Sequence, residues 1–144
     1  MTQVRFYHNA PDRLRAACAI TTKAVAQGHR IVVFAPDAAT ARRYDAQLWT
    51  QQAQSFVPHV SIDSALAART PVVITTRLAG LPHEDMLLNL ADDLPDGFER
   101  FGQLVEIVAG DEAGVQAARA RWRLYKAGNH PVQAFDLAAP RDDS

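Results

Sequence analysis

The sequence predicts an α/β fold in which one mostly parallel sheet carries helices on both faces. The chain opens with strand-like, helical, strand-like and helical segments in turn, an order typical of a parallel sheet. The run Ile31-Val32-Val33-Phe34 has no polar residue, as expected for a strand buried on both faces. No internal repeat or composition shift divides the chain, so we expect a single domain over residues 1–138.

Length and charge limit the classes of function. A chain of 144 residues, 48% of them hydrophobic, can bury a core of its own. The net charge of −1 argues against binding nucleic acid over the whole surface, so any attraction for polyanions needs a local patch. Cys18 is the only cysteine, which excludes an internal disulfide and a cysteine-based zinc site. Without a bilayer-length apolar run or a signal-peptide pattern, we expect a cytoplasmic protein.

The first half of the chain supplies two strand–helix pairs. Residues 3–8 are rich in β-formers and predict the first strand. Pro11 and Asp12 suit the first turn of a helix, which Gly28 then ends. Residues 30–35 form the second strand, and the following Pro-Asp pair begins a second helix over residues 38–50.

The second half is less regular. A polar linker over residues 51–59 becomes extended before Pro58, because a residue that precedes proline avoids the helical region. Asp111 caps a last helix over residues 112–127, and Gly128 lies past its end. The remaining segments are strands at residues 71–75, 86–90 (which also fits a helix) and 103–108, helical turns at 62–68 and 95–101, an edge strand at 132–137, and a flexible acidic tail at 139–144.

The loops that follow the strands lack the chemistry of a nucleotide site. Neither GxGxxG nor GxxxxGK[ST] occurs, and carboxylates at both early helix starts would repel a phosphate. The five histidines are scattered and lack metal-ligand spacing, so we expect neither a metal nor a cofactor. His59 could act as a base at a strand end, but a structural histidine beside Pro58 is the favoured interpretation. The local cluster His83-Glu84-Asp85 suits capping better than metal binding.

Cationic and aromatic residues alternate in the last helix. On a helical wheel Arg119, Arg123 and Lys126 share one narrow stripe, with Trp122 at its edge. Two interpretations stay open: a stripe that binds an acidic ligand with an apolar group, or a solvated basic face with Trp122 in the core. Apolar residues continue on two sides of the wheel, one with Val115, Ala118 and Tyr125 and the other with Ala117, Ala120 and Leu124.

Trp49 and Phe56 flank the polar linker. They either close the edge of the core or form an apolar patch for another protein, and the residues favour neither.

Three blocks of residues give the chain a family resemblance. They are Phe6-Tyr7, then Tyr44-Asp45-Ala46-Gln47-Leu48-Trp49 leading to Ser55-Phe56-Val57-Pro58-His59, and the stretch over residues 119–128. In these blocks the chain resembles the chi subunit of bacterial DNA polymerase III, a small protein of the clamp-loader assembly. The resemblance implies a Rossmann-like, single-domain fold without a nucleotide-binding loop, and no catalytic activity of its own.

The resemblance also implies two partners. One is the acidic C-terminal tail of single-stranded DNA-binding protein (SSB), which ends in a phenylalanine with a free carboxylate. Arg119 and Arg123 would pair with its acidic groups, Trp122 and Val115 would flank the phenyl ring, and Lys126 and Arg121 would add longer-range attraction. In this arrangement Ala117, Ala120 and Leu124 face the sheet and Trp122 lies at the rim of the pocket, an assignment that a wholly buried Trp122 would disprove.

The second partner implied is the psi subunit of the clamp loader, with a competing helicase-like protein in some members. The matching residues place this surface at Leu48, Trp49, Phe56 and Pro58. Two departures are notable: Trp122 stands where a tyrosine is usual, and residues 133–144 do not match the family pattern. Two other functions remain open, a small enzyme that uses a loop histidine such as His59 or His83, and direct binding of single-stranded DNA.

Overall fold

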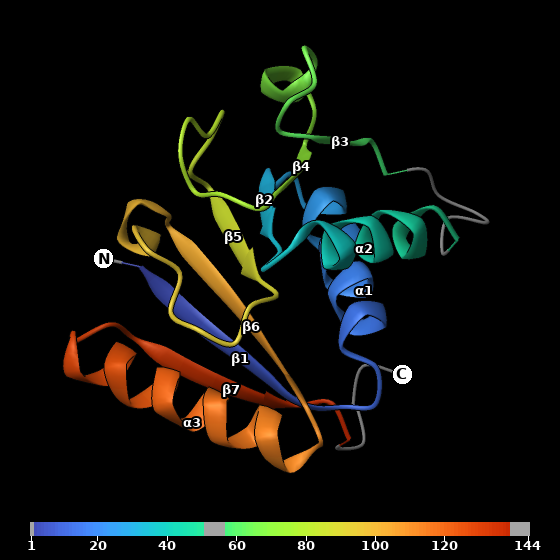
Figure 1. Cartoon of the computed structure of the whole chain (residues 1–144). Coiled ribbons are helices and arrows are strands. Elements are labelled where there is room, and N and C mark those ends of the chain that lie inside the picture. Colours follow the sequence, from blue (N-terminus) through green and yellow to red (C-terminus); the bar gives the residue numbers. More distant parts are fainter. Residues whose placement is uncertain (1, 51–56, 139–144) are drawn as a thin grey trace.

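A computed structural model describes residues 2–50 and 57–138. These residues form one seven-stranded sheet in the order β3-β4-β2-β5-β6-β1-β7, in which every paired neighbour is parallel (Figure 1). The strands are β1 (Gln3–Ala10), β2 (Ile31–Phe34), β3 (His59–Ser61), β4 (Val72–Thr75), β5 (Met86–Asn89), β6 (Gln103–Ala109) and β7 (Val132–Asp136). The predicted α/β class with a mostly parallel sheet is confirmed.

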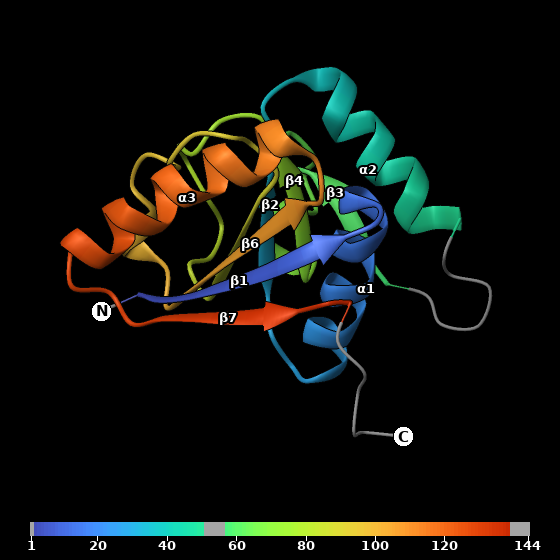
Figure 2. The ribbon, with the colours of Figure 1, turned by 90° about the horizontal axis from the view of Figure 1, so that it is seen from below.

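Three α-helices in the described part of the chain cover the two faces of this sheet. Helices α1 (Arg13–Ala26) and α2 (Ala38–Thr50) lie on one face, and α3 (Glu112–Ala127) lies on the other (Figure 2). The 3-10 helix η2 (Phe98–Arg100) lies within the turn predicted at 95–101, and η1 (Ala67–Arg69) overlaps the turn predicted at 62–68 only at its end. None of the described helices is long and apolar enough to cross a membrane.

Alternation along the strands divides the core into two layers. Tyr7 and Ile107 point toward α1 and α2, whereas Phe6 and Val108, their neighbours in β1 and β6, point toward α3. The central strands β2, β4 and β5 are almost wholly buried, which explains their continuous apolar sequences. Residues 86–90, which fitted either a strand or a helix, contain β5 in the middle of the sheet.

The edges of the sheet differ from the sequence prediction in one respect. Strand β7 lies beside β1 at one edge, as expected for residues 132–137. Strand β3, at the other edge, was not predicted: three residues are too few for a pattern to reveal, and the pairing with β4 alone defines it. The predicted flexible tail, residues 139–144, lies outside the described residues.

Candidate functional site

Helix α3 is fixed at both ends by its own sequence. The Asp111 carboxylate caps it by accepting a 3.2 Å hydrogen bond from the backbone N–H of Gly114. At the other end the Gly128 N–H donates to the carbonyl oxygen of Leu124. The chain then returns through Asn129, which adopts a positive φ of 62°, and enters β7. The chain therefore turns directly from α3 into the edge strand β7, and the two elements contact each other.

A hollow of about 320 Å³ lies between α3 and the strands β1, β6 and β7. Val115, Arg119 and Trp122, three of the residues predicted to bind the acidic tail, line it. The other lining residues are Phe6, His8, Asn9, Val108, Ala118 and Ala134. Its surface is therefore mostly apolar, with one arginine at the helix wall.

Trp122 is half-buried at the wall of this hollow, not wholly buried. Its ring centroid lies 5.2 Å from that of Phe6, so the indole packs against β1. The Lys126 Nζ lies 5.7 Å from the Trp122 ring centroid, within the range of a cation–π contact. Arg123 and Lys126 are exposed and do not line the hollow, so of the three cations on the stripe only Arg119 reaches it.

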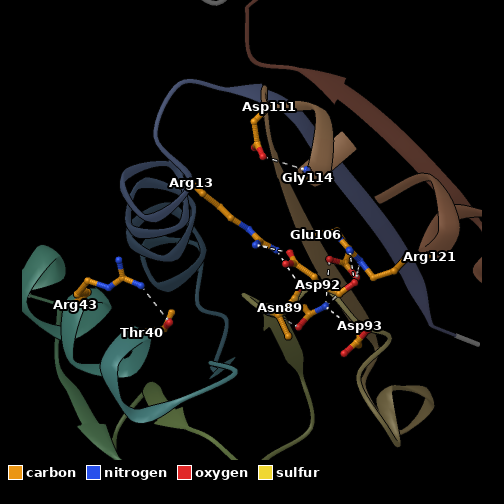
Figure 3. Close-up of polar contacts among 11 residues, drawn as sticks. Arg13, Thr40, Arg43, Asn89, Asp92, Asp93, Glu106, Asp111, Gly114 and Arg121 are labelled. Carbon is orange, nitrogen blue, oxygen red and sulfur yellow. Dashed lines mark hydrogen bonds and ion pairs between the residues drawn. The ribbon is translucent and has the colours of Figure 1, made fainter. Parts of the chain in front are cut away.

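A buried polar network underlies α3 (Figure 3). The Glu106 carboxylate, on β6, accepts a 2.5 Å hydrogen bond from Tyr125 Oη and two bonds from Asn89 Nδ2. Arg121 Nε lies 3.1 Å from the same carboxylate, and Arg121 also donates to the Asp92 carbonyl oxygen at 2.6 Å. Since Glu106 and Arg121 are both buried, their partners compensate for the loss of water.

This network corrects two predictions about α3. Arg121 was expected to add long-range attraction for an acidic ligand, but it is buried and paired with Glu106. The side of the helix that faces the sheet consists of Ala118, Arg121 and Tyr125. Leu124, which was expected there with Ala117 and Ala120, is 55% exposed, and Ala120 is exposed too. The prediction placed every arginine outside the core. The predicted sheet-facing side of α3 therefore differs from the observed one by a rotation of about a quarter turn or more.

The network also shifts two titrating groups. Burial raises the pKa of the Glu106 carboxyl above its usual value, although Arg121 and the hydrogen bonds from Tyr125 and Asn89 oppose the shift. Burial, together with the neighbouring Glu106 charge, raises the pKa of the Tyr125 hydroxyl. The tyrosine therefore keeps its proton and acts as the donor in its short bond to Glu106.

The end of α2 carries the second predicted surface. Trp49 is 54% exposed and Pro58 is exposed, which makes both accessible to a partner. Leu48 is fully buried and supports α2 from within, so it cannot itself contact a partner in this conformation. Phe56 lies outside the described residues.

His59 is a structural residue beside this surface. Its side chain is wholly buried, Nδ1 lies 2.8 Å from the Val57 carbonyl oxygen, and Nε2 lies 3.1 Å from Asp45 Oδ1. The imidazole also packs edge-on against Trp49, with ring centroids 4.8 Å apart. The favoured interpretation of His59 as a structural histidine agrees with these contacts.

Neither histidine of the enzyme alternative lines the hollow beside α2. That space, about 610 Å³, lies at the carboxyl ends of β3 and β4 beside α2, with Arg42, Asp45, Asp63 and Arg77 among its lining residues. His83 lies elsewhere, in the segment before β5, where burial and the nearby Arg30 charge lower its pKa. Among the described residues no three histidine, cysteine or acidic side chains gather to hold a metal ion.

Comparison with known sequences identifies the family. Residues 1–133 match the family model described as DNA polymerase III chi subunit, HolC. The chain belongs to this family. Chi proteins are subunits of a DNA polymerase assembly, which agrees with the expectation that this chain has no activity of its own.

Curated chi subunits are similar over most of the chain. The chi subunit of Pseudomonas aeruginosa is 31% identical over 141 residues, which cover 95% of this chain and 98% of that protein. The Haemophilus influenzae protein is 29% identical over 108 residues (74% of this chain and 75% of that one), and the Escherichia coli protein 28% over 121 residues (83% and 79%).

Solved structures with the same fold come from proteins of other names. The C-terminal domain of Dbp5 from S. cerevisiae superposes with a TM-score of 0.60 and 13% identity, covering 96% of this chain and 92% of that one. Domain 2 of the DEAD-box helicase Mss116p gives a TM-score of 0.64 at 14% identity, covering 99% and 66%. At such low identity these likenesses concern the Rossmann-like fold alone.

The residues that hold the α3 site of this chi protein were missed from the sequence, although one signal was present. Glu106 is the only charged residue in the strand Gln-Leu-Val-Glu-Ile-Val-Ala, and it shares a face with Leu104 and Val108. A carboxylate at a core position needs a buried partner. That requirement could have assigned Arg121, rather than the apolar Leu124, to the inner face of α3.

Proposed function

We propose that this chi protein links the clamp loader of DNA polymerase III, in the cytoplasm, to SSB. The tail of SSB would bind in the hollow between α3 and the strands β1, β6 and β7. The observation that carries the proposal is that Arg119, Trp122 and Val115 converge on one mostly apolar hollow whose only basic lining residue besides His8 is Arg119. Such a site suits a peptide that ends in a phenyl ring and a carboxylate.

The hollow has the size and the walls that a phenyl ring needs. An apolar cavity of about 150 Å³ accommodates benzene, and this one is about 320 Å³, although it is open to solvent. Phe6, Val115 and Trp122 offer apolar contacts to the ring. Arg119 lies at the same wall and can pair with the terminal carboxylate, since it takes part in no ion pair among the described residues.

The exposed cations of α3 would act at longer range. Arg123 and Lys126 lie one turn or more beyond Arg119, toward the C-terminus of the helix, where the helix dipole also favours positive charge. They would attract the acidic residues that precede the phenylalanine, and salt would screen that attraction. Each tail would bind weakly, but a coated single strand displays many tails, which raises occupancy by effective concentration.

The exposed end of α2 is the proposed site for the psi subunit or a helicase-like competitor. Trp49 and Pro58 supply the accessible apolar groups, and Phe56 belongs to the same sequence block. This end of α2 belongs to the layer on the other face of the sheet from α3. The two partners can therefore bind at the same time, which a linking protein requires.

The test is a titration with a peptide of the SSB tail. We expect binding to weaken at least tenfold when the terminal phenylalanine is removed, and by a similar factor for Arg119→Ala, because each change removes one half of the recognition. Arg42→Ala, which removes an exposed cation from α2, is the matched control and should bind as the unmodified chain does.

Two results would contradict the proposal. One is equal affinity for the peptides with and without the phenylalanine. The other is full binding by a folded Arg119→Ala, Trp122→Ala double variant. Affinity for a bare oligonucleotide equal to that for the peptide would instead favour direct binding of single-stranded DNA.

A further inference from the structure

Among the described residues, no helix covers one part of the sheet on the side of α1. Helix α1 packs over β2 and β6, and α3 covers the opposite face. Figure 2 shows β1 and β7 extending beyond α1 at that edge of the sheet. The wall of α1 and the uncovered faces of the two strands form what we call the α1–β7 corner, lined by Arg5, Tyr7, Ile20, Lys23, Phe135 and Leu137.

The floor of the corner is apolar. The rings of Tyr7 and Phe135 stack with centroids 5.1 Å apart and an interplanar angle of 21°, and Phe135 remains 39% exposed. Two hollows of about 210 and 430 Å³ lie along α1 and share Ala19, Ile20 and Leu137, so they form one continuous groove. An exposed aromatic stack beside a groove is unusual for a surface that faces water alone.

The rim of the corner is positively charged and lacks a partner in the described structure. Arg5, Arg15 and Lys23 line the groove, and none of them makes an ion pair with another described residue. The Arg5 Nε, in the same groove, is buried and has no hydrogen-bond partner among the described residues. The one carboxylate of the groove, Asp12, already caps α1 by accepting from the Arg15 N–H.

The spacing of these cations suits a helical ligand. Arg15, Ala19 and Lys23 are four residues apart and share one side of α1, so the two charges stand about 12 Å apart along the helix. The five residues of β7 span about 16 Å, which matches about eleven residues of helix. A second helix laid beside α1 would complete the layer on this face, as neighbouring helices do in α/β sheets.

We propose that the α1–β7 corner binds an acidic amphipathic helix of about three turns from another protein. Its apolar face would cover Tyr7, Ile20, Phe135 and Leu137, and its acidic flank would pair with Arg5, Arg15 and Lys23. This surface lies on the opposite face of the sheet from the hollow of α3 and at the opposite edge from Trp49. The inference is therefore independent of the proposed tail-binding function.

The experiment uses the full chain and a synthetic probe. The probe is a fluorescein-labelled 14-residue peptide of leucine, alanine and glutamate, with the leucines on one helical face and the glutamates beside them. A second peptide has the same composition in an order that leaves no apolar face. We expect saturable binding of the first peptide by fluorescence anisotropy, at least tenfold weaker binding of the second, and amide shift changes confined to α1, β1 and β7.

Two variants separate this surface from α3. Arg15→Glu with Lys23→Glu should weaken the probe about tenfold, because both cations of the α1 rim become repulsive. Glutamate at position 15 also suits the first turn of α1, and circular dichroism would verify the fold. Arg119→Glu should leave the probe unaffected while it abolishes binding of the SSB tail peptide.

Four results would overturn the proposal. The first three are equal binding of the two peptides, probe-induced shifts that map to α3, and unchanged affinity in the Arg15→Glu, Lys23→Glu variant. Probe binding that appears only after Asp142→Asn and Asp143→Asn would also overturn it, because the occupant would then be the acidic end of this chain itself.

Discussion

Helices α3 and α2 each present a proposed binding surface, but different forces hold them to the sheet. The buried pair Glu106–Arg121 and the hydroxyl of Tyr125 fix α3. Apolar contacts of Tyr44 and Leu48 fix most of α2, with a Tyr44–Thr21 hydrogen bond of 2.6 Å and a half-exposed Asp45 that lies 3.1 Å from His59. The hydrogen bonds of a buried polar network are satisfied in one rotation of the helix about its axis, whereas apolar side chains can pack in several rotations. We infer that the polar network fixes how the surface residues of α3 are arranged, whereas the contacts of α2 mainly hold that helix to the sheet.

The largest expected effect tests the polar half of this comparison. Arg121→Met should lower the free energy of unfolding by about 3–5 kcal/mol, because it leaves the Glu106 carboxylate buried without its cation. Urea denaturation measures the change. Adding Glu106→Gln removes the uncompensated charge and should recover part of the loss. If Arg121→Met costs under 1 kcal/mol, the network does not hold α3.

The apolar half is tested next. Leu48→Ala should lower the free energy of unfolding by about 3 kcal/mol, since a fully buried leucine leaves a cavity. Trp49→Ala should cost less stability, as more than half of its surface is already exposed, but should weaken binding of the α2 partner. Denaturation and partner binding measured on both variants separate interior support from contact. A stable Leu48→Ala variant that loses its partner would contradict this division.

These two helices also mark how far the sequence could predict the molecule. The strand–helix order, the parallel sheet and the residues Arg119, Trp122 and Val115 of the hollow followed from periodicity, capping and family blocks. The rotation of α3 about its axis did not follow. A helical wheel places Arg121 on the surface because it contains no information about its partner Glu106 on β6. The partner of a buried charge lies on another strand, and a local pattern contains no information about it.

A matched pair of substitutions, each removing one tyrosine hydroxyl from the α3 or the α2 layer, should have smaller effects on stability. Tyr125→Phe deprives the Glu106 carboxylate of its donor, and bonds to charged groups contribute most, so we expect a loss of about 2 kcal/mol. Tyr44→Phe removes a bond between neutral hydroxyls and should cost about 1 kcal/mol. Thermal or urea unfolding of the two variants provides the measurement. The reverse order would mean that the α3 network is less tightly coupled than its distances indicate.

Both tyrosines should make the protein sensitive to alkali. Burial raises the pKa of Tyr44 and of Tyr125 above the unfolded value near 10. Each therefore contributes stability that is fully present below about pH 10 and is lost as the pH rises beyond it, since only the unfolded chain releases the proton. Unfolding measured between pH 9 and 11 should show a shallower loss in either phenylalanine variant. Equal slopes in all three proteins would contradict the burial of these hydroxyls.

The smallest effect concerns local opening, and Cys18 reports it. Its thiol lies on α1 beneath α2, 3.9 Å from the Tyr44 carbonyl oxygen, and burial raises its pKa to about 12. A thiol reagent should therefore label the native protein far more slowly than the unfolded chain. If apolar adhesion lets α2 open locally, Leu48→Ala should speed labelling more than an equally destabilising change in the α3 layer, such as Arg121→Met. Labelling that depends only on global stability would mean that the two layers open together, and the contrast between the helices would then concern specificity alone.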